Sequence, residues 1–372
     1  MKQHKPLIIL FILILALPTL DTIFNISPIS ELFEKRIATP LPSGPTNISE
    51  LTKYPKKFEK FYDDNYGFRK TLISLNSTIS DKIFNESPDD RAVIGKNGWL
   101  YFDNKKSLLD AVGKATISDE LVNRGVQSFA KNWQKMKSKN INYLLIIAAD
   151  KSTIYPEFLP DYLPYQEPHR IDKFLNALKN QYPDFPVLDL RPILKKAKIT
   201  QNSDGDIYHK TDTHWNMLGA HLAYEEMMKK LSIQPHPKSD FVIENKKSFY
   251  GDIALIINSK ITESKMSFVP KFPITYQLVR KKPKEFDDFH KSQLFVNKNK
   301  SLPTLFAYKD SFFDNLRFLT ASHLSKTVYV NEFPCDLDFK VIQPHLNPKG
   351  SNIVIQQFWE GRIEDILNKC ES

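Results

Sequence analysis

From residue 121 onward the chain alternates short apolar segments with longer stretches whose apolar residues recur every three to four positions. The short segments predict buried strands, and the periodic stretches predict amphipathic helices. The predicted strands are residues 143–149, 186–190, 302–307, 326–330 and 352–355, and the predicted helices are residues 121–137, 171–180 and 216–231, the last capped by Asn216. Strands that are apolar along their whole length suit a mostly parallel sheet with helices on both faces, so the sequence predicts an α/β fold.

The composition excludes several other classes of protein. Hydrophobic residues make up 41% of the 372 residues, too many for a disordered chain, and 11 glycines are too few for a collagen-like one. Two cysteines can neither staple a disulfide scaffold nor supply a four-thiolate zinc site. The net charge of +9 is spread along the chain, which favours a basic surface near anionic material over a nucleic-acid reader.

The N-terminus has the pattern of an export signal. Lys2 and Lys5 precede an apolar run over residues 7–17, and no small-residue cleavage site follows. We predict an uncleaved signal anchor over residues 1–26, with a cleaved signal peptide and a buried terminal helix as alternatives. The basic residues would stay in the cytoplasm, which places the rest of the chain on the periplasmic, extracytoplasmic side of the inner (cell) membrane. In that oxidising compartment Cys335 and Cys370 could pair, although the sequence leaves open whether they lie close enough.

Three regions separate the anchor from the α/β segments. Residues 27–50 are rich in Pro, Ser and Asn and predict a linker. Residues 51–90 have helical spacing and predict an N-terminal extension of one domain that covers residues 51–372. Residues 92–102 predict a β-hairpin with its turn at Asn97 and Gly98. Farther along, residues 280–300 carry seven Lys or Arg and predict a solvated surface insertion.

Polar side chains follow or precede the predicted elements at three places. Residues 150–152 (Asp-Lys-Ser) follow the strand 143–149, and residues 310–312 (Asp-Ser-Phe) follow the strand 302–307. Residues 212–216 (Asp-Thr-His-Trp-Asn) lead into the last of the three predicted helices. Loops at strand ends are where an open α/β sheet collects its functional residues.

Asp212, His214 and Ser311 are the candidate catalytic residues. In a turning segment an Asp and a His two positions apart can point into one cleft, where the carboxylate fixes the imidazole tautomer and supports the imidazolium. A serine at a strand-to-helix junction has an exposed hydroxyl beside backbone N–H groups that can stabilise an oxyanion. Together the three residues supply nucleophile, base and orienter for acyl transfer. Taken singly, each motif also fits an ordinary helix cap or loop.

Four segments resemble the alginate O-acetyltransferase family (AlgJ/AlgX-like), whose members are export-side proteins with an SGNH-hydrolase-like domain. The segments are residues 62–69 (Tyr-Asp-Asp-Asn-Tyr-Gly-Phe-Arg), 94–102 (Ile-Gly-Lys-Asn-Gly-Trp-Leu-Tyr-Phe), 150–157 (Asp-Lys-Ser-Thr-Ile-Tyr-Pro-Glu) and 212–216. The similarity covers roughly residues 54–360, and Asp-Thr-His-Trp is its most specific part.

The resemblance implies a fold and a set of roles. It implies an SGNH-hydrolase-like sheet in which the Asp–His pair precedes the serine, a permuted order of catalytic motifs compared with ordinary SGNH esterases. Ser311 would be the nucleophile that carries the acetyl group, His214 the general base and Asp212 its orienter. The Ser311 N–H would be one oxyanion donor. This chain departs from the usual Gly-Asp-Ser at Lys309, whose side chain stands beside the turn that holds the nucleophile.

Further residues are candidates for substrate binding. Lys151 and Tyr155 are predicted to contact a sugar or an acyl donor, and Trp215 to stack on a sugar ring. The alternatives are an ion pair and packing for the first two, and core packing for Trp215. The remaining histidines show no metal-ligand spacing, so we predict neither a metal nor a cofactor.

The sequence therefore predicts an O-acetyltransferase that moves acetyl to hydroxyls of an extracellular or cell-envelope polysaccharide. The resemblance implies that a polytopic membrane O-acyltransferase (MBOAT-type) delivers the acetyl group. The inner membrane, reached through the N-terminal anchor, is the other expected partner, and nucleic acid is not. A carbohydrate esterase with the same Ser-His-Asp triad and a non-catalytic polysaccharide-binding or assembly protein are the alternatives.

Overall fold

The computed structural model describes residues 5–24, 39–68, 71–72, 87, 89–103, 107–200, 205–259, 261–279 and 292–370. The chain forms two compact units, one made of Met1–Ala92 with Ala254–Lys260 and the other of Val93–Ile253 with Ile261–Ser372. Residues 27–38 of the predicted linker, 73–86 of the predicted extension and 280–291 of the predicted insertion lie outside the described residues.

The first unit contains the helices α1 (Lys5–Phe24) and α2 (Ile48–Asn65). By length and composition α1 could cross a membrane, because Lys5–Thr22 has a mean hydropathy of 1.9. Helix α2 begins inside the predicted linker, at residue 48, because the side chain of Asn47 accepts a hydrogen bond from the backbone N–H of Glu50 and caps the first turn. The linker prediction was therefore wrong for residues 48–50.

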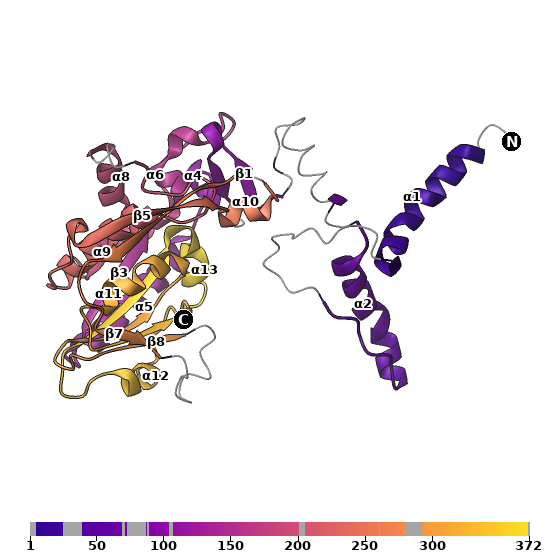
Figure 1. The fold of residues 1–372 in the computed structure, drawn as a ribbon. Helices are drawn as coiled ribbons and strands as arrows, with labels where there is room; N and C mark the ends of the chain where they lie inside the picture. Colours follow the sequence, from indigo (N-terminus) through magenta and orange to yellow (C-terminus); the bar gives the residue numbers. More distant parts are fainter. Residues whose placement is uncertain are drawn as a thin grey trace. The chain divides into compact units, whose positions relative to one another are not determined.

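The second unit is built on a sheet whose described strands run in the order β4-β3-β11-β9-β10-β8-β7. These strands are β3 (Asn142–Ala148), β4 (Val187–Asp189), β7 (Tyr276–Leu278), β8 (Gln293–Asn297), β9 (Thr304–Tyr308), β10 (Lys326–Val330) and β11 (Asn352–Trp359). Figure 1 labels β3, β7 and β8 of this sheet. The first five in the spatial order pair in parallel, and β8 and β7 complete one side in antiparallel pairing. All five predicted strands are confirmed, and the sheet is mixed with a parallel majority.

The helices of this unit alternate with the parallel strands along the chain. They are α4 (Ser107–Ala111), α5 (Asp119–Lys137), α6 (Lys151–Ile154), α7 (Arg170–Gln181), α8 (Arg191–Thr200), α9 (Met217–Lys230), α11 (Arg317–Ala321), α12 (Phe339–Ile342) and α13 (Ile363–Leu367), with α10 (Asp252–Ile256) at the boundary of the units. Helices α5, α7 and α9 match the three predicted helices. Asn216 caps α9 as predicted, since its side chain accepts from the N–H groups of Leu218 and Gly219.

Successive residues of β3 enter two separate hydrophobic clusters, because side chains alternate across a strand. Leu144 and Ile146 belong to a cluster that contains residues of α8 and α9, whereas Leu145 and Ile147 belong to one that contains residues of α5, α7 and α13. The strand is buried along nearly its whole length, which explains its continuous apolar sequence.

The antiparallel part of the sheet was not predicted. Residues 293–297, placed by the prediction in a solvated insertion, instead form β8, because Leu294 and Phe295 are buried in the two clusters. A second pair, β5 (Phe241–Phe249) and β6 (Glu263–Pro270), forms its own antiparallel ribbon between α9 and β7 in the sequence. The predicted hairpin is confirmed as β1 (Ala92–Ile94) and β2 (Leu100–Phe102), with Asn97 and Gly98 both at positive φ in its turn.

The two cysteines form a disulfide. Cys335 and Cys370 are bonded, with a Cα–Cα distance of 4.9 Å, so the question that the sequence left open is answered. The bond ties the segment after β10 to the C-terminal end of α13, and both sulfur-bearing residues are buried.

Candidate active site

The loop that precedes α9 places Asp212 against His214. The Nδ1 atom of His214 lies 2.7 Å from Oδ1 of Asp212, and the backbone N–H of His214 donates to the same oxygen at 3.0 Å. With Nδ1 paired to a carboxylate, that nitrogen carries the proton and Nε2 is left with a lone pair. The imidazole is therefore oriented with its basic nitrogen pointing away from Asp212.

Ser311 lies at the other side of the imidazole. It is the first residue of a short 3-10 helix, Ser311–Asn315, which follows β9 after a two-residue turn. Its Oγ is 2.7 Å from Nε2 of His214, and the residue is exposed to solvent. The structure thus brings together the three candidate catalytic residues, which are separated by about a hundred positions in the sequence.

Buried Asp310 fixes the turn that presents Ser311. Its carboxylate accepts hydrogen bonds from the Nε2 of Gln357 at 2.8 Å and from the backbone N–H groups of Trp359 and Phe312 at 2.6 and 2.9 Å. Burial raises the pKa of Asp310, although these donors pull it back. Two of the donors come from β11, so the carboxyl end of this strand fixes the position of the turn that carries Ser311.

Lys309 fits this turn without a glycine. The residue is buried and is not among those at positive φ, so its Cβ meets no conformational penalty there. Its ammonium forms an ion pair with Asp314 in the 3-10 helix, and its backbone N–H donates to the carbonyl of Val330 at 2.9 Å. Among the described residues, none accepts a hydrogen bond from the N–H of Ser311, which leaves this donor available to an oxyanion.

A second carboxylate, which the sequence did not reveal, faces the imidazole. Oδ2 of Asp252 lies 3.8 Å from Nδ1 of His214. Its Oδ1 accepts from the N–H of Thr213 at 2.7 Å, and its own N–H donates to Oδ2 of Asp212 at 2.9 Å. The preceding Gly251 is required by close approach, because a Cβ there would lie 2.1 Å from the carbonyl oxygen of Thr211. The sequence signal for Asp252 is the Gly-Asp pair at 251–252, and such pairs are too common to single out one residue as part of a site.

The two carboxylates set the protonation of the site. Burial alone would lower the pKa of His214, but the hydrogen bond and charge of Asp212, with a further contribution from Asp252, raise it above its ordinary value. Burial alone would also raise the pKa of Asp212, and the His214 interaction outweighs it and holds this pKa well below its usual range. The imidazolium that forms during proton transfer is therefore stabilised where it would appear.

Asp212, His214 and Asp252 also bring potential ligand atoms within 4.8 Å of one another. Each group already has a partner inside the cluster: Asp212 binds the imidazole and the N–H of Asp252, and Asp252 binds Thr213. A metal would have to displace the contact between Asp212 and His214 to be held by the same atoms. The donor set therefore fits a proton relay better than a cation site.

Lys151 lies beneath the loop rather than in an open cleft. Its ammonium donates to the carbonyl oxygens of Asp212, His209 and Lys210 at 2.7, 3.1 and 3.1 Å, and the residue is 3% exposed. An ammonium has three N–H donors, so none remains for a ligand. Burial lowers the pKa of Lys151 to about 8, and the charge of Asp212 only partly offsets this effect.

Tyr155 and Trp215 are buried as well. The hydroxyl of Tyr155 accepts from the N–H of Ile207 at 2.9 Å, and its ring lies 4.3 Å from the ring of Trp99. Trp215 packs edge-on against Phe312 at 5.1 Å. Burial of Tyr155 and Trp215 fits the packing alternative, whereas Lys151 makes backbone contacts in place of the ion pair that was its alternative; contact of the three residues with a sugar stays a prediction.

Two further contacts secure the same loop. The carboxylate of Glu263, on β6, accepts from the backbone N–H groups of Lys210 and Thr211 at 3.0 and 2.8 Å. Burial opposes its charge, but hydrogen bonds from His209 and Thr211 bring the pKa of Glu263 to about 2. The β5–β6 ribbon, which the sequence did not predict, thus supplies an anchor for the segment that carries Asp212.

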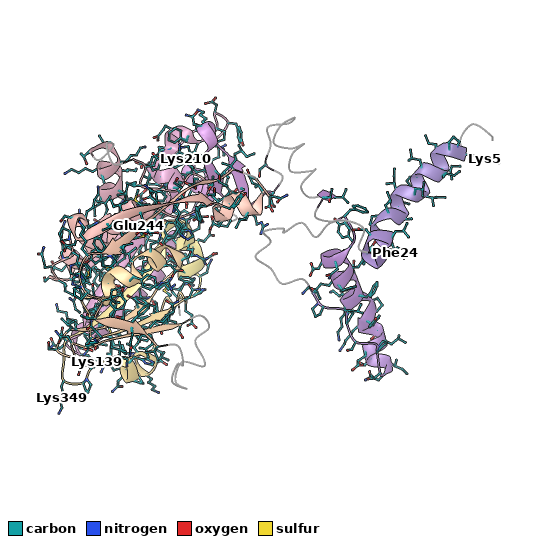
Figure 2. All side chains as sticks on the ribbon, in the orientation of Figure 1. Lys5, Phe24, Lys139, Lys210, Glu244 and Lys349 are labelled. Atoms are coloured by element: carbon teal, nitrogen blue, oxygen red, sulfur yellow. A yellow bond between two sulfur atoms is a disulfide. The ribbon has the colours of Figure 1, made fainter. Side chains whose placement is uncertain are left out.

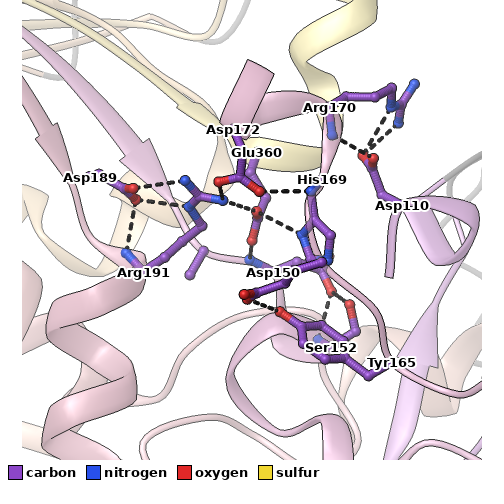
Figure 3. A network of polar contacts seen from close by, with 12 residues as sticks. Asp110, Asp150, Ser152, Tyr165, His169, Arg170, Asp172, Asp189, Arg191 and Glu360 are labelled. Atoms are coloured by element: carbon purple, nitrogen blue, oxygen red, sulfur yellow. Dashed lines mark hydrogen bonds and ion pairs between the residues drawn. The ribbon is translucent and has the colours of Figure 1, made fainter. Parts of the chain in front are cut away.

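A charged cluster joins the carboxyl ends of β3 and β11 (Figure 3). The N–H of Asp150 donates to Oε1 of Glu360 at 2.5 Å, and Oε2 of Glu360 lies 3.5 Å from Arg191 and 3.7 Å from His169. Burial and the charge of Glu360 raise the pKa of Asp150 to about 6. Asp150 also accepts from the N–H of Ser152 at 2.7 Å and so caps α6, the short helix that begins with Lys151.

Comparison with known proteins gives a family match over the region that holds most of the site. Residues 92–301 match the family described as "SGNH hydrolase-like domain, acetyltransferase AlgX". Two curated relatives, both named probable alginate O-acetylase AlgJ, come from Pseudomonas syringae pv. tomato and Pseudomonas aeruginosa. The first is 29% identical over 47% of this chain and 42% of its own, and the second is 24% identical over 66% and 56%. The chain thus spans about half the length of the curated relatives it matches.

Solved structures share the fold at low sequence identity. PatB1 from Bacillus cereus, solved with a sulfonyl adduct, has a TM-score of 0.54 and 16% identity over 74% of this chain and 99% of its own. A DHHW family protein from Eubacterium siraeum has a TM-score of 0.51 and 17% identity over 76% and 99%. The likeness establishes a common architecture for the larger part of the chain.

Proposed function

The chain belongs to the SGNH hydrolase-like, AlgX acetyltransferase family, and from this membership we propose that it is an O-acetyltransferase that modifies an extracellular or cell-envelope polysaccharide. The observation that carries the proposal is the contact series from Asp212 to His214 to Ser311, with both steps at 2.7 Å. An exposed serine hydroxyl with a correctly oriented imidazole is what acyl transfer requires of a nucleophile and its base.

In the first half-reaction the acetyl group moves to the protein. Oγ of Ser311 attacks the acetyl carbonyl carbon while Nε2 of His214 takes the hydroxyl proton. The backbone N–H of Ser311 stabilises the oxyanion of the tetrahedral intermediate, and Asp212 stabilises the imidazolium. When the intermediate collapses, the bond to the leaving oxygen breaks and that oxygen receives the proton from Nε2.

In the second half-reaction a sugar hydroxyl replaces the leaving group. The hydroxyl loses its proton to Nε2 of His214 as its oxygen attacks the acetyl-serine, and Ser311 then leaves and regains that proton. One imidazole thus acts first as base and then as acid in each half-reaction. Its raised pKa suits both roles, because the protonated form persists long enough to be used as the acid.

The order of the motifs and the placement of the chain belong to the same proposal. Asp212 and His214 precede Ser311 in a permuted order of the SGNH motifs, on a sheet with helices on both faces. We place the globular unit on the extracytoplasmic side of the inner membrane, anchored through α1, where a membrane O-acyltransferase would deliver acetyl. The AlgJ relatives are named for alginate, which favours a polyuronate as the acceptor class.

Mass spectrometry of the intact protein tests this proposal. After incubation with an acetyl ester, we expect one added acetyl group on Ser311, abolished in Ser311→Ala and His214→Ala. Ser322→Ala is a matched control, because the hydroxyl of that serine donates to the carbonyl of Leu319 and so has its own partner within α11. An unmodified Ser311, or acetyl on another residue in both active-site variants, would exclude the mechanism.

The exposure of Ser311 also admits water, which favours hydrolysis as a second candidate function. An esterase would release free acetate at the same rate whether or not an oligosaccharide is present. For a transferase, an added oligouronate diverts the acetyl group to sugar hydroxyls at the expense of acetate. The ratio of the two products, followed by NMR, distinguishes the candidates.

A further inference from the structure

Helix α2 carries an apolar face that the described residues of its own unit leave exposed. None of the residues of α2 is buried, and even its large apolar side chains are exposed. Ile48 is 82% exposed, Leu51 58% and Phe58 42%. At 100° per residue these three lie within one sector of the helix, together with the tyrosines and phenylalanines of α2. The members of this sector, which we call the aromatic stripe, are Ile48, Leu51, Tyr54, Phe58, Phe61 and Tyr62.

The opposite side of α2 is charged. Lys53, Lys56, Lys57 and Lys60 fall within about 100° of one another on the helix, across from the aromatic stripe. The acidic residues of α2 lie among or beside these lysines and equal them in number: Glu50, Glu59, Asp63 and Asp64. A charged side opposite an aromatic and aliphatic one is the pattern of helices that lie in a membrane surface. Tyrosine adds to this pattern, because its ring is apolar and its hydroxyl polar, as the boundary between lipid tails and water requires.

The end of α2 is bound to the end of α1. The N–H of Gly67 donates to the carbonyl of Pro18 at 3.1 Å and to Oγ1 of Thr22 at 2.7 Å, and the N–H of Phe68 donates to Oδ2 of Asp21 at 2.7 Å. Gly67 is needed for this approach, since a Cβ there would lie 2.2 Å from the Pro18 oxygen. The segment after α2 therefore lies against residues 18–22 of α1.

This contact fixes α2 at a particular depth. Helix α1 has 20 residues and so extends about 30 Å, the thickness of a bilayer hydrocarbon core. The large side chains exposed from Leu7 to Leu15 are all apolar. Figure 2 draws the side chains of this helix as sticks between the labelled Lys5 and Phe24. From Lys5 to Asp21 the helix rises about 24 Å at 1.5 Å per residue, so with the Lys5 side chain extended to the cytoplasmic surface, Asp21 and Thr22 lie near the opposite surface, and the end of α2 lies at that level too.

We propose that α2 is an interfacial helix, which lies in the outer membrane–water boundary with its aromatic stripe in the lipid and its charged side toward the headgroups and water. The inference rests on the anchoring role of α1 in the proposed function and adds a second membrane contact to it. The contact between the segment after α2 and residues 18–22 of α1 selects the lipid surface as the occupant, because it holds the end of α2 at the level where α1 leaves the membrane. The globular unit would then be tethered through a helix that is itself held at the surface.

Site-directed spin labelling of the full chain in proteoliposomes tests the inference. The native cysteines are both in the disulfide, so a single introduced cysteine is the only site that reacts. Three variants suffice: Leu13→Cys in α1, Phe58→Cys in the aromatic stripe, and Lys57→Cys, its neighbour on the charged side. The vesicles are an equal mixture of phosphatidylcholine and phosphatidylglycerol, and the readout is accessibility to oxygen, which enriches in lipid, relative to a water-soluble nickel chelate.

We expect oxygen accessibility to exceed that of the chelate at Leu13→Cys and Phe58→Cys, and the reverse at Lys57→Cys. A label at Leu13→Cys in lipid with one at Phe58→Cys in water would overturn the interfacial helix and leave the anchor standing. Exclusion of both reagents at Phe58→Cys would mean protein cover instead of lipid, which also overturns it. A water-exposed Leu13→Cys label would remove the anchor and the inference together.

Discussion

Replacement of Asp212 by asparagine tests the electrostatics of the site most directly. The Asp212 carboxylate touches Nδ1 of His214 at 2.7 Å and holds the imidazole in the tautomer that leaves Nε2 basic. In Asp212→Asn the amide can present its NH2 group to Nδ1 and so select the other tautomer, whose Nε2 carries the proton and cannot accept one from Ser311. The change removes charge and orientation at once, with almost no change in volume.

The size of the effect follows from two distances. Opposite charges about 4 Å apart attract by roughly 4 kcal/mol at an effective dielectric of about 20, equal to about 3 pKa units. Asp252 remains, 3.8 Å from Nδ1, so part of the imidazolium stabilisation survives the substitution. In serine hydrolases the corresponding change lowers the rate by about 10⁴ through the wrong tautomer, so we expect a loss on the order of 10³–10⁴ here. Asp252→Asn, which breaks no hydrogen bond to the imidazole, should cost about 10-fold.

The assay is the rate of acetyl-enzyme formation as a function of pH. Because His214 must be neutral to accept a proton and its pKa is raised, the rate of the unaltered protein should fall as the pH drops and be half-maximal above the ordinary value of 6.5. Loss of either carboxylate destabilises the imidazolium, so this acid limb moves to lower pH in both variants. Asp206→Asn removes an exposed carboxylate from the same loop and is the control. An unshifted limb in Asp212→Asn, or a larger rate loss in Asp252→Asn, would refute the reasoning.

Three other changes give defined outcomes. Lys309→Gly removes the ion pair with Asp314 and adds backbone freedom, so calorimetry should show a melting temperature lowered by the equivalent of about 1–2 kcal/mol. Mass spectrometry should still find acetyl on the nucleophile, and loss of that acetylation would make Lys309 part of the site. The disulfide between Cys335 and Cys370 spans 35 positions, so its replacement by paired serines should cost about 2–4 kcal/mol in urea unfolding, and an unchanged midpoint would contradict the loop-entropy argument. The pKa of Glu263 is lowered to about 2 in the folded protein, so the stabilisation that its carboxylate gives is present above pH 4.5 and lost as the pH falls through 2. Glu263→Gln should lower the free energy of unfolding at neutral pH by up to about 3 kcal/mol, and this difference should disappear in acid. Parallel curves of stability against pH for the variant and the unaltered protein would refute this prediction.

The sequence predicted the parallel part of the fold because those strands are apolar on both faces. It missed β8, because the many Lys and Arg residues over 280–300 indicated a solvated surface and hid the five residues 293–297 that form the strand. It also shortened β11 by four residues, since Gln356 and Gln357 interrupt the apolar run. Both glutamines are buried, and each has a buried partner elsewhere in the fold: Gln356 bonds to the hydroxyl of Tyr143, and Gln357 to Asp310. Periodicity cannot recognise a polar residue whose partner lies far away in the sequence.

The candidate site likewise contains residues that local motifs reveal and residues that only the folded chain brings there. Asp212, His214 and Ser311 stand in recognisable motifs, and the structure brings them into contact. Lys151 was also singled out, but as a ligand contact, because it follows a strand at the end of the sheet where a cleft is expected. Its burial depends on the fold of the 209–212 loop above it, which no local pattern specifies. Asp252 could not be found for a similar reason, since only the folded loop brings it to the imidazole.

The burial of Lys151 has a consequence for how the site is built. Keeping an ammonium away from water is unfavourable, as the fall of its pKa to about 8 reflects, and a methionine would fill the same space without that cost. What only the ammonium can do is bind three carbonyl oxygens that converge from one turn, including that of Asp212 itself. Asp150 fixes the helix from which Lys151 projects and is tied to Glu360 at the end of β11, and β11 in turn fixes Asp310 beside the nucleophile. The loop that carries Asp212 and His214 and the turn that carries Ser311 come from distant parts of the chain, but contacts to the ends of the same strands hold both of them. This common support accounts for the presence of a costly buried charge next to the loop.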